Sequence, residues 1–279
     1  MSIDVLQNKI RKLKNPSAVV FTPDPELIPG GQSVRDYFGA LLEALRDHVA
    51  AARFDVAEYA LYPGGLEDLS ALTVTAKAMG YYVILDWTAL ESVGRAKRSA
   101  EAILKEQRWS CDAMVISCYG GTDILKPWFK AAGKDRDLFP VIKTANKSGT
   151  ELQDLQTGGR FVYTAAADLI SRLGETAMER CGYSRLGVTA GCYNAASLRT
   201  LRQNYPKLFL LVDGLDQTGC NAKNASYAFD QLGHGALVCA GESILGAWKE
   251  GEERPDPVTA ALEAAERMRK NLNRYVTIL

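Results

Sequence analysis

The stretch VILDWTALES, residues 83–92, decides the fold because a buried strand runs there directly into a polar loop. Three apolar residues precede Asp86, and near-continuous apolar runs are typical of strands that helices cover on both faces. Similar runs recur along the chain. The eight strands that we expect span residues 18–21, 56–62, 82–86, 113–118, 139–144, 186–191, 208–213 and 236–240.

Helical patterns alternate with these strands. Apolar residues recur at spacings of three and four, which predicts helices over residues 34–52, 65–80, 93–107, 163–182, 194–206, 221–233 and 256–275. Asn194 is an expected N-cap, while Gly80 and Gly182 are expected to end helices. The alternation indicates a single (β/α)8 TIM barrel over residues 1–279, with an extra N-terminal helix (1–15) and a C-terminal helix (256–275). An open doubly wound sheet is the alternative, but the even spacing favours the barrel.

Composition excludes several classes of protein. The 279 residues are 47% hydrophobic, and 33 basic residues balance 33 acidic ones, which argues against nucleic acid as a partner. No apolar run is long enough for a membrane span, and the basic amphipathic N-terminus is not a secretory signal. The six cysteines follow no paired spacing. We therefore expect free thiols and a cytoplasmic location.

In a barrel of this kind, active sites lie on the loops that follow the carboxyl ends of the strands. Polar and thiol side chains are frequent at these positions, so a small-molecule site is expected there. The positions are Thr22, Asp86, Thr88, Glu91, Cys118, Tyr119, Thr144, Asn146, Cys192, Asp213, Asp216, Gln217 and Glu242.

Several loops resemble those of one known family. The segments are PDPELIP, ISCYGGTDILKPWF, FPVIKTANKSGTELQDLQ, LGVTAGCYNAASLRTLRQNYP, LLVDGLDQTG and ALVCAGESILGAWK. In this order they resemble the longer bacterial subgroup of the orotidine 5'-phosphate decarboxylases, over about residues 16–249. The resemblance implies a TIM barrel, a carboxy-lyase of pyrimidine metabolism, and a homodimer whose active sites lie at the subunit interface.

The catalytic motif of that family departs from the pattern here. The family carries Asp-x-Lys-x-x-Asp after the third strand, whereas this chain has Asp86, Thr88 and Glu91. The family's lysine protonates the carbon that CO₂ leaves, and a threonine hydroxyl is too weak an acid for that step. Glu91 keeps the charge of the last acid, which in the family reaches into the neighbouring subunit.

Other positions of the family differ in the same direction. Thr22 replaces the aspartate that holds the ribose, and Arg53 replaces a lysine of the charge network. Glu242 stands where an arginine binds the phosphate, and a carboxylate there repels a phosphate. Gln217 matches the glutamine of the seventh loop, and Ala145 replaces the serine that reads the pyrimidine. The candidate catalytic residues are Asp86, Glu91 and Arg53, and the candidate ligand-binding residues are Thr22, Thr88, Thr144, Asn146, Gln217 and Glu242.

Several side chains allow two interpretations. The acidic residues at the mouth suit a cation or an oxygen-ligated metal, but no spacing motif supports a metal, and neither a metal nor a cofactor is expected. The cysteines near strand ends fit buried apolar thiols better than a metal or redox site. Trp87 fills the pocket or stacks on a ligand, and Asp86 serves the site, caps a helix or pairs with Arg53. Lys143 is a possible replacement cation, although an outward-facing lysine is favoured.

Three functions remain open. The preferred hypothesis is a non-catalytic barrel that binds a nucleotide-like or cationic small molecule or a partner, as a homodimer or a heteromer with a catalytic paralogue. The second is an enzyme of changed specificity that uses Asp86, Glu91 and Glu242. The third is a functional decarboxylase with a relocated cation such as Arg53 or Lys143.

Overall fold

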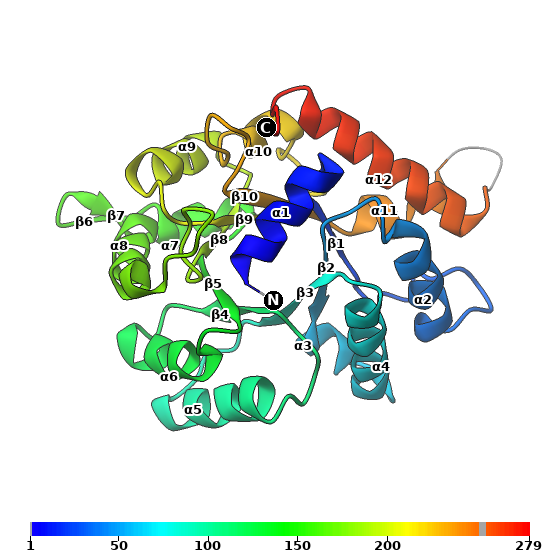
Figure 1. The fold of residues 1–279 in the computed structure, drawn as a ribbon, viewed down its shortest axis with the longest axis horizontal. Helices are drawn as coiled ribbons and strands as arrows, with labels where there is room; N and C mark the ends of the chain where they lie inside the picture. Colours follow the sequence, from blue (N-terminus) through cyan, green and yellow to red (C-terminus); the bar gives the residue numbers. More distant parts are fainter. Residues whose placement is uncertain (1, 251–254) are drawn as a thin grey trace.

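The computed structural model describes residues 2–250 and 255–279. Eight parallel strands of this part close into a barrel in the order β1-β10-β9-β8-β5-β4-β3-β2, which confirms the expected (β/α)8 fold (Figure 1). The strands are β1 (Ser17–Val20), β2 (Ala51–Asp55), β3 (Tyr82–Trp87), β4 (Ala113–Ser117), β5 (Asp137–Lys143), β8 (Val188–Gly191), β9 (Leu210–Asp213) and β10 (Ala236–Ala240).

Helices surround the barrel, so the strands are buried on both faces, as their apolar sequences require. The N-cap expected at Asn194 is confirmed, since its side chain accepts a hydrogen bond from the amide of Ala196. Gly80 follows the C-cap of its helix with φ +86°, a conformation that favours glycine. The main helices are α2 (Val34–Leu45), α4 (Gly65–Ala78), α5 (Val93–Ala100), α6 (Thr122–Ala132), α8 (Val162–Gly174), α9 (Ala195–Asn204), α10 (Ala222–Ser226), α11 (Glu242–Leu245) and α12 (Pro257–Asn273).

The strand expected over residues 56–62 is wrong. The second strand is β2, just before it, and the expected segment begins with the short helix α3 (Val56–Tyr59). The Asp55 side chain caps α3 by accepting a hydrogen bond from the amide of Ala57. The two alanines that open β2 looked like the end of the preceding helix, but pairing with β1 and β3 draws them into the sheet.

Other boundaries also differ from expectation. The helix expected over 163–182 ends as α8 at Gly174, and the one expected over 221–233 forms only α10. The segment expected over 93–107 continues from α5 into a π-helical turn, Glu101–Lys105. A helix at α6 was not expected, and the helix contains Pro127. Helix α7 (Thr150–Gln153) and the hairpin of β6 (Gln156–Thr157) and β7 (Arg160–Phe161) were also not expected.

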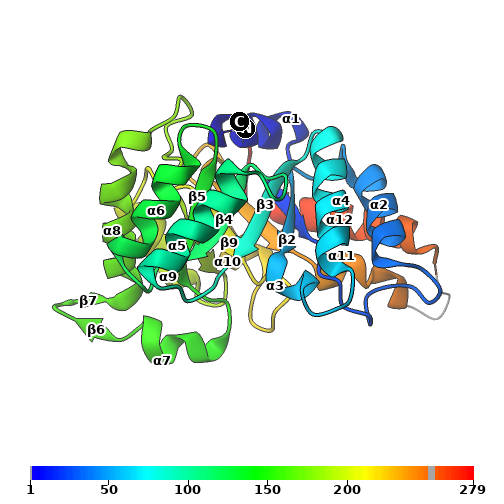
Figure 2. The same cartoon turned by 90° about the horizontal axis from the view of Figure 1, so that it is seen from below.

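The N-terminal helix α1 (Ile3–Leu13) lies across one end of the barrel, opposite the end that carries α7 and the β6–β7 hairpin (Figure 2). Asp4 accepts a hydrogen bond from the amide of Cys181, and Gln7 accepts one from the amide of Gly235. Both amides precede barrel strands, so α1 covers the amino ends. The carboxyl ends of the strands are left for a site.

Within the described residues, none of the helices has both the length and the apolar character that crossing a bilayer demands.

Candidate ligand site at the carboxyl ends of the strands

A central cavity of about 410 Å³ opens at the carboxyl ends of the barrel strands. It is concave and partly polar, as small-molecule sites usually are. Its lining residues are Arg53, Asp86, Thr88, Leu90, Ser117, Tyr119, Val141, Lys143, Thr144, Ala145, Asn146, Thr189, Asp213 and Gln217. The structure therefore brings six candidates from the sequence together here: Arg53, Asp86, Thr88, Thr144, Asn146 and Gln217.

A buried charge cluster forms the floor of this cavity. Arg53 donates through Nη2 to Asp86 Oδ2 at 2.5 Å, and its Nη1 lies 3.1 Å from Asp213 Oδ2. Arg53 and Asp86 are only 6% and 4% exposed. Burial opposes the charge of Arg53, but the carboxylates of Asp213 and Asp86 outweigh it and raise the pKa of Arg53 above its ordinary value. The guanidinium is therefore always charged, and it cannot supply a proton.

One oxygen of this cluster lacks a partner. Asp86 Oδ1 is buried and has no hydrogen-bond partner among the described residues. A buried carboxylate oxygen without a donor carries a desolvation cost, which a donating ligand group can remove. Asp86, which lines the cavity, thus keeps a buried carboxylate oxygen whose hydrogen-bonding capacity the described residues leave unused.

Asp55 lies beside this cluster and was not among the site residues predicted from the sequence. It is the register partner of Asp86 across β2 and β3. Burial and the carboxylate of Asp86 raise the pKa of Asp55 to about 6. Asp55 could have been found from the sequence, because it is the last residue of the second strand when that strand is placed correctly. Ser117, the last residue of β4, and Thr189, within β8, also line the cavity and were not among the predicted site residues.

Lys143 also lines the cavity, but its charge is already paired. It is buried, its Nζ binds the carboxylate of Asp154, and it lies 4.9 Å from the ring centroid of Tyr163. The preference for an outward-facing lysine is wrong, because Lys143 lines the central cavity and is 3% exposed. Its ammonium is held at the edge of the site by an acid from the following loop.

Thr88 and Glu91, both in the loop after β3, have different surroundings. Thr88 lines the central cavity, whereas the Glu91 side chain is only 2% exposed and points away from it. Trp87 Nε1 donates to Glu91 Oε1 at 3.1 Å, and Trp128 Nε1 donates to Glu91 Oε2 at 2.9 Å. The carboxylate of Glu91 is therefore bound within its own chain by two indoles. Trp87 lines a separate apolar cavity of about 610 Å³ rather than the central one.

Two polar candidates of the β5 loop are held by local hydrogen bonds. Gln153 Oε1 accepts from the amide of Thr144 at 2.9 Å, and the Thr144 hydroxyl accepts from Gln153 Nε2 at 2.9 Å. Asn146 Nδ2 donates to Ser148 Oγ at 2.8 Å. These contacts fix the loop, and both Thr144 and Asn146 line the central cavity.

The remaining two candidates lie elsewhere. Thr22 and Glu242 line a different cavity of about 760 Å³, between the loop after β1 and α3. Asp24 and Glu58 join Glu242 on its wall, so this cavity is acidic. Thr22 and Glu242 are not among the residues that line the central cavity, and the candidate ligand set is divided between two pockets.

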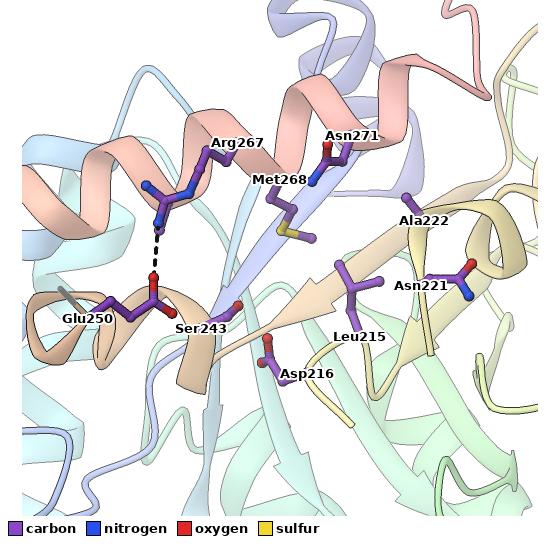
Figure 3. Close-up of a pocket in the computed structure, with 10 residues that line it drawn as sticks. Leu215, Asp216, Asn221, Ala222, Ser243, Glu250, Arg267, Met268 and Asn271 are labelled. Atoms are coloured by element: carbon purple, nitrogen blue, oxygen red, sulfur yellow. Dashed lines mark ion pairs between the residues drawn. The ribbon is translucent and has the colours of Figure 1, made fainter. Parts of the chain in front are cut away.

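The loops after β9 and β10 are joined by an internal carboxylate. Asp216 Oδ2 accepts a hydrogen bond from the amide of Gly241 at 2.5 Å. Behind this contact lies a further cavity of about 450 Å³, closed on its other side by Met268 and Asn271 of α12 (Figure 3). Arg267 on its rim is paired with Glu250 at 3.6 Å. The Gly241 amide is consequently already occupied by an anion from the protein itself.

Metal-ligating groupings are absent from the described residues, in which no three His, Cys, Asp or Glu side chains gather to hold an ion. All six cysteines are free. Burial raises the pKa of Cys118 and of Cys239 to about 12, so these two thiols remain protonated near neutral pH.

Comparisons with known proteins place this geometry in a family, although no family model matches the chain. Orotidine 5'-phosphate decarboxylase of Dehalococcoides mccartyi (strain CBDB1) is 30% identical over 279 residues, 98% of this chain and 97% of the relative. That of Clostridium novyi (strain NT) is 30% identical over 219 residues, 76% and 74% of the two chains. The solved OMP decarboxylase of Leishmania donovani shares the fold, with a TM-score of 0.77 at 22% identity over 98% of this chain and 99% of that one. The chain therefore belongs to the orotidine 5'-phosphate decarboxylase family.

Proposed function

We propose that this chain is a non-catalytic member of the family that binds a small molecule at the central cavity and does not decarboxylate orotidine monophosphate by the family's mechanism. The carrying observation is Thr88, which stands at the position of the family's lysine and lines the cavity. The two cations on the cavity wall, Arg53 and Lys143, are both paired with carboxylates. Neither is free to protonate a carbanion as the lysine does.

The phosphate side of the site supports the same proposal. The resemblance assigns the loops after β9 and β10 to the phosphate, and there Asp216 occupies the amide of Gly241. Glu242 replaces the arginine of the next position. Neither Asp216 nor Glu242 lines the central cavity itself, but both stand on the loops that the resemblance assigns to the phosphate, where two carboxylates repel a phosphate dianion. A neutral or cationic nucleoside-like ligand fits this charge pattern better than a nucleotide does.

A decarboxylation assay tests the catalytic part. The protein, purified from a host that lacks its own decarboxylase, is expected to consume no orotidine monophosphate above background, even at high enzyme concentration. A family enzyme with the intact lysine serves as the positive control. Turnover by this chain would contradict the proposal and would point to Arg53 or Lys143 as the relocated cation.

Calorimetric titration tests the binding part. Uridine is the probe for a neutral ligand, and uridine monophosphate is the phosphorylated comparison. Wild-type protein is expected to bind uridine at least as tightly as the nucleotide. The double variant Asp216→Asn, Glu242→Arg is expected to gain affinity for the nucleotide alone, since both changes remove negative charge from the phosphate loops. A wild-type preference for the nucleotide would contradict the assigned ligand class.

An enzyme of changed specificity is the second candidate, and Asp55 favours it. An acid with a pKa of about 6 beside Asp86 suits general acid–base chemistry near neutral pH. This version relies on Asp86, which lines the central cavity, and on Asp55, its register partner on β2, because Glu91 and Glu242 lie apart from that cavity. A metabolite screen in which turnover disappears in both Asp86→Ala and Asp55→Asn would replace the first proposal with this one.

We also propose a homodimer, as the family resemblance implies. Helix α3 and its following turn contribute to both the acidic cavity of Glu58 and the apolar cavity of Trp87, whose rim carries Arg95, Arg98 and Arg108. Leu61 and Leu90 near these cavities are 79% and 78% exposed. A two-fold contact across α3 would bury both leucines and would bring the acidic surface of one subunit against the basic surface of the other.

A further inference from the structure

Two cysteines lie in neighbouring segments at the carboxyl ends of the barrel strands. Cys192 follows the end of β8, and Cys220 immediately precedes the N-cap of α10. The amide of Cys192 donates to the carbonyl of Asp213 at 3.0 Å, at the start of the loop that carries Cys220. Cys192 is fully buried, whereas Cys220 is only partly buried. The pair thus has one protected thiol and one that solvent reaches.

The surrounding contacts hold the two segments in place. Asn224 Nδ2 lies within 3.4 Å of the carbonyl of Cys192 and within 3.2 Å of the carbonyl of Gly219. Gly219 adopts φ +91°, and a Cβ at that position would meet the Tyr193 ring at 3.0 Å. The Asn224 side chain and the close approach of Gly219 to Tyr193 therefore hold the segment of Cys192 against the segment of Cys220.

Cys220 differs from the other thiols in its chemistry. A side-chain hydrogen bond with Cys192 lowers the pKa of Cys220, and this effect exceeds the opposing effects of burial and of Asp213. The same hydrogen bond, and after it burial, raise the pKa of Cys192. In contrast, burial raises the pKa of Cys111 to about 11. A partly exposed thiol of lowered pKa next to a second cysteine is the arrangement found at redox-sensitive sites.

We propose that Cys192 and Cys220 are an oxidation site that forms a reversible disulfide when the protein meets a hydroperoxide. The Cys220 thiolate attacks the peroxide oxygen, which gives a sulfenic acid and, after protonation of the leaving group, water from hydrogen peroxide. The sulfur of Cys192 then attacks the sulfenic sulfur, and a second water leaves. One peroxide is reduced, and two thiols are oxidised.

The bond would join the end of β8 to the loop between β9 and α10. That loop carries Gln217, which lines the central cavity, and it begins after Asp213 of the charge cluster. The amide of Cys220 already donates to the carbonyl of Gln217 at 3.0 Å. Oxidation would therefore restrict the loop that covers one wall of the cavity, whichever ligand the cavity takes.

Thiol counting and intact mass test the proposal directly. The reduced protein is treated with a modest excess of hydrogen peroxide, denatured, alkylated and mapped by peptide mass spectrometry. The expected product loses two of the six alkylatable thiols, with a Cys192–Cys220 linked peptide, and dithiothreitol restores both thiols. Cys220→Ser is expected to abolish the linkage, whereas Cys111→Ser is expected to retain it.

Cys192→Ser distinguishes the thiol that reacts with peroxide from the thiol that resolves the sulfenic acid. Without a resolving thiol, Cys220 is expected to proceed to a sulfinic acid under the same treatment. The proposal is overturned if both cysteines of the wild-type protein remain alkylatable after oxidation, or if Cys220 is linked instead to another cysteine. These readouts do not depend on the proposed ligand, so a failure here is distinct from a failure of the proposed function.

Discussion

At the scale of single residues, the buried cluster of Arg53, Asp86 and Asp213 governs both the site and the stability of the barrel floor. Arg53→Met would leave the buried carboxylate of Asp86 and the partly exposed carboxylate of Asp213 without their cation. We expect a loss of about 3–5 kcal/mol in the free energy of unfolding, measured by urea denaturation. The exposed pair partner Arg46 provides the control, since Arg46→Met is expected to cost less than about 1 kcal/mol.

The same cluster offers a second comparison. Adding Asp86→Asn to Arg53→Met is expected to recover part of the lost stability, because it removes one of the unpaired charges. A cost for Arg53→Met as small as that of the surface control would mean that the cluster is open to water.

Asp137 predicts a pH dependence of stability. It is fully buried, accepts a hydrogen bond from the Tyr82 hydroxyl, and has one oxygen without a partner among the described residues. Burial raises the pKa of Asp137 from 3.8 to about 8, against the lowering effects of Tyr82 and Arg185. The folded protein therefore binds this proton more tightly than the unfolded chain does. The stabilisation that Asp137 gives the folded state through its raised pKa is fully present below about pH 4 and is lost as pH rises toward 8.

Asp137→Asn checks this pH dependence. The amide cannot ionise, so we expect the variant to gain stability relative to wild type as pH rises from 5 to about 8.5, by up to several kcal/mol. Urea denaturation at a series of pH values measures the difference. A constant difference between the two proteins across that range would show that Asp137 does not titrate there.

At the scale of elements, α1 seals the amino end of the barrel while the opposite end carries the site. Leu6 of α1 is fully buried, and its neighbour Val5 is 41% exposed. Leu6→Ala is expected to cost about 2–5 kcal/mol because it leaves a cavity under the helix. Val5→Ala is the matched control and is expected to change the denaturation midpoint little. Equal effects of the two variants would show that α1 contributes no packing to the barrel.

At the scale of the whole molecule, the proposed dimer predicts a measurable mass. Light scattering after size-exclusion chromatography is expected to give twice the mass of the chain. Leu61→Asp is expected to shift the protein toward the monomer, because it places a charge in an apolar contact. Val74 of α4 is 55% exposed and lies outside both cavities, so Val74→Asp should leave the dimer intact. A monomeric wild-type protein would rule out the assembly.

Much of the architecture follows from the sequence alone. Buried strands, covering helices and turns repeat in alternation, and such local periodicity depends only on neighbouring residues. The strand at 82–86 and the strand at 236–240 were placed almost as the structure has them. The second strand was misplaced because its alanines suit a helix and a strand equally, and only pairing with β1 and β3 decides between them. The identity of Thr88 is likewise a property of the sequence.

The tertiary structure decided how the candidate residues are grouped. Glu91 looks like part of a catalytic motif, yet Trp128, distant in the chain, helps to bind it inside the subunit. Lys143 is paired by Asp154, and the Gly241 amide is occupied by Asp216. The sequence by itself determined the barrel and the loss of the motif lysine, because the strand and helix periodicity and the identity of one residue depend only on the local sequence. The pairing of charges depended on contacts between loops that only the closed barrel brings together.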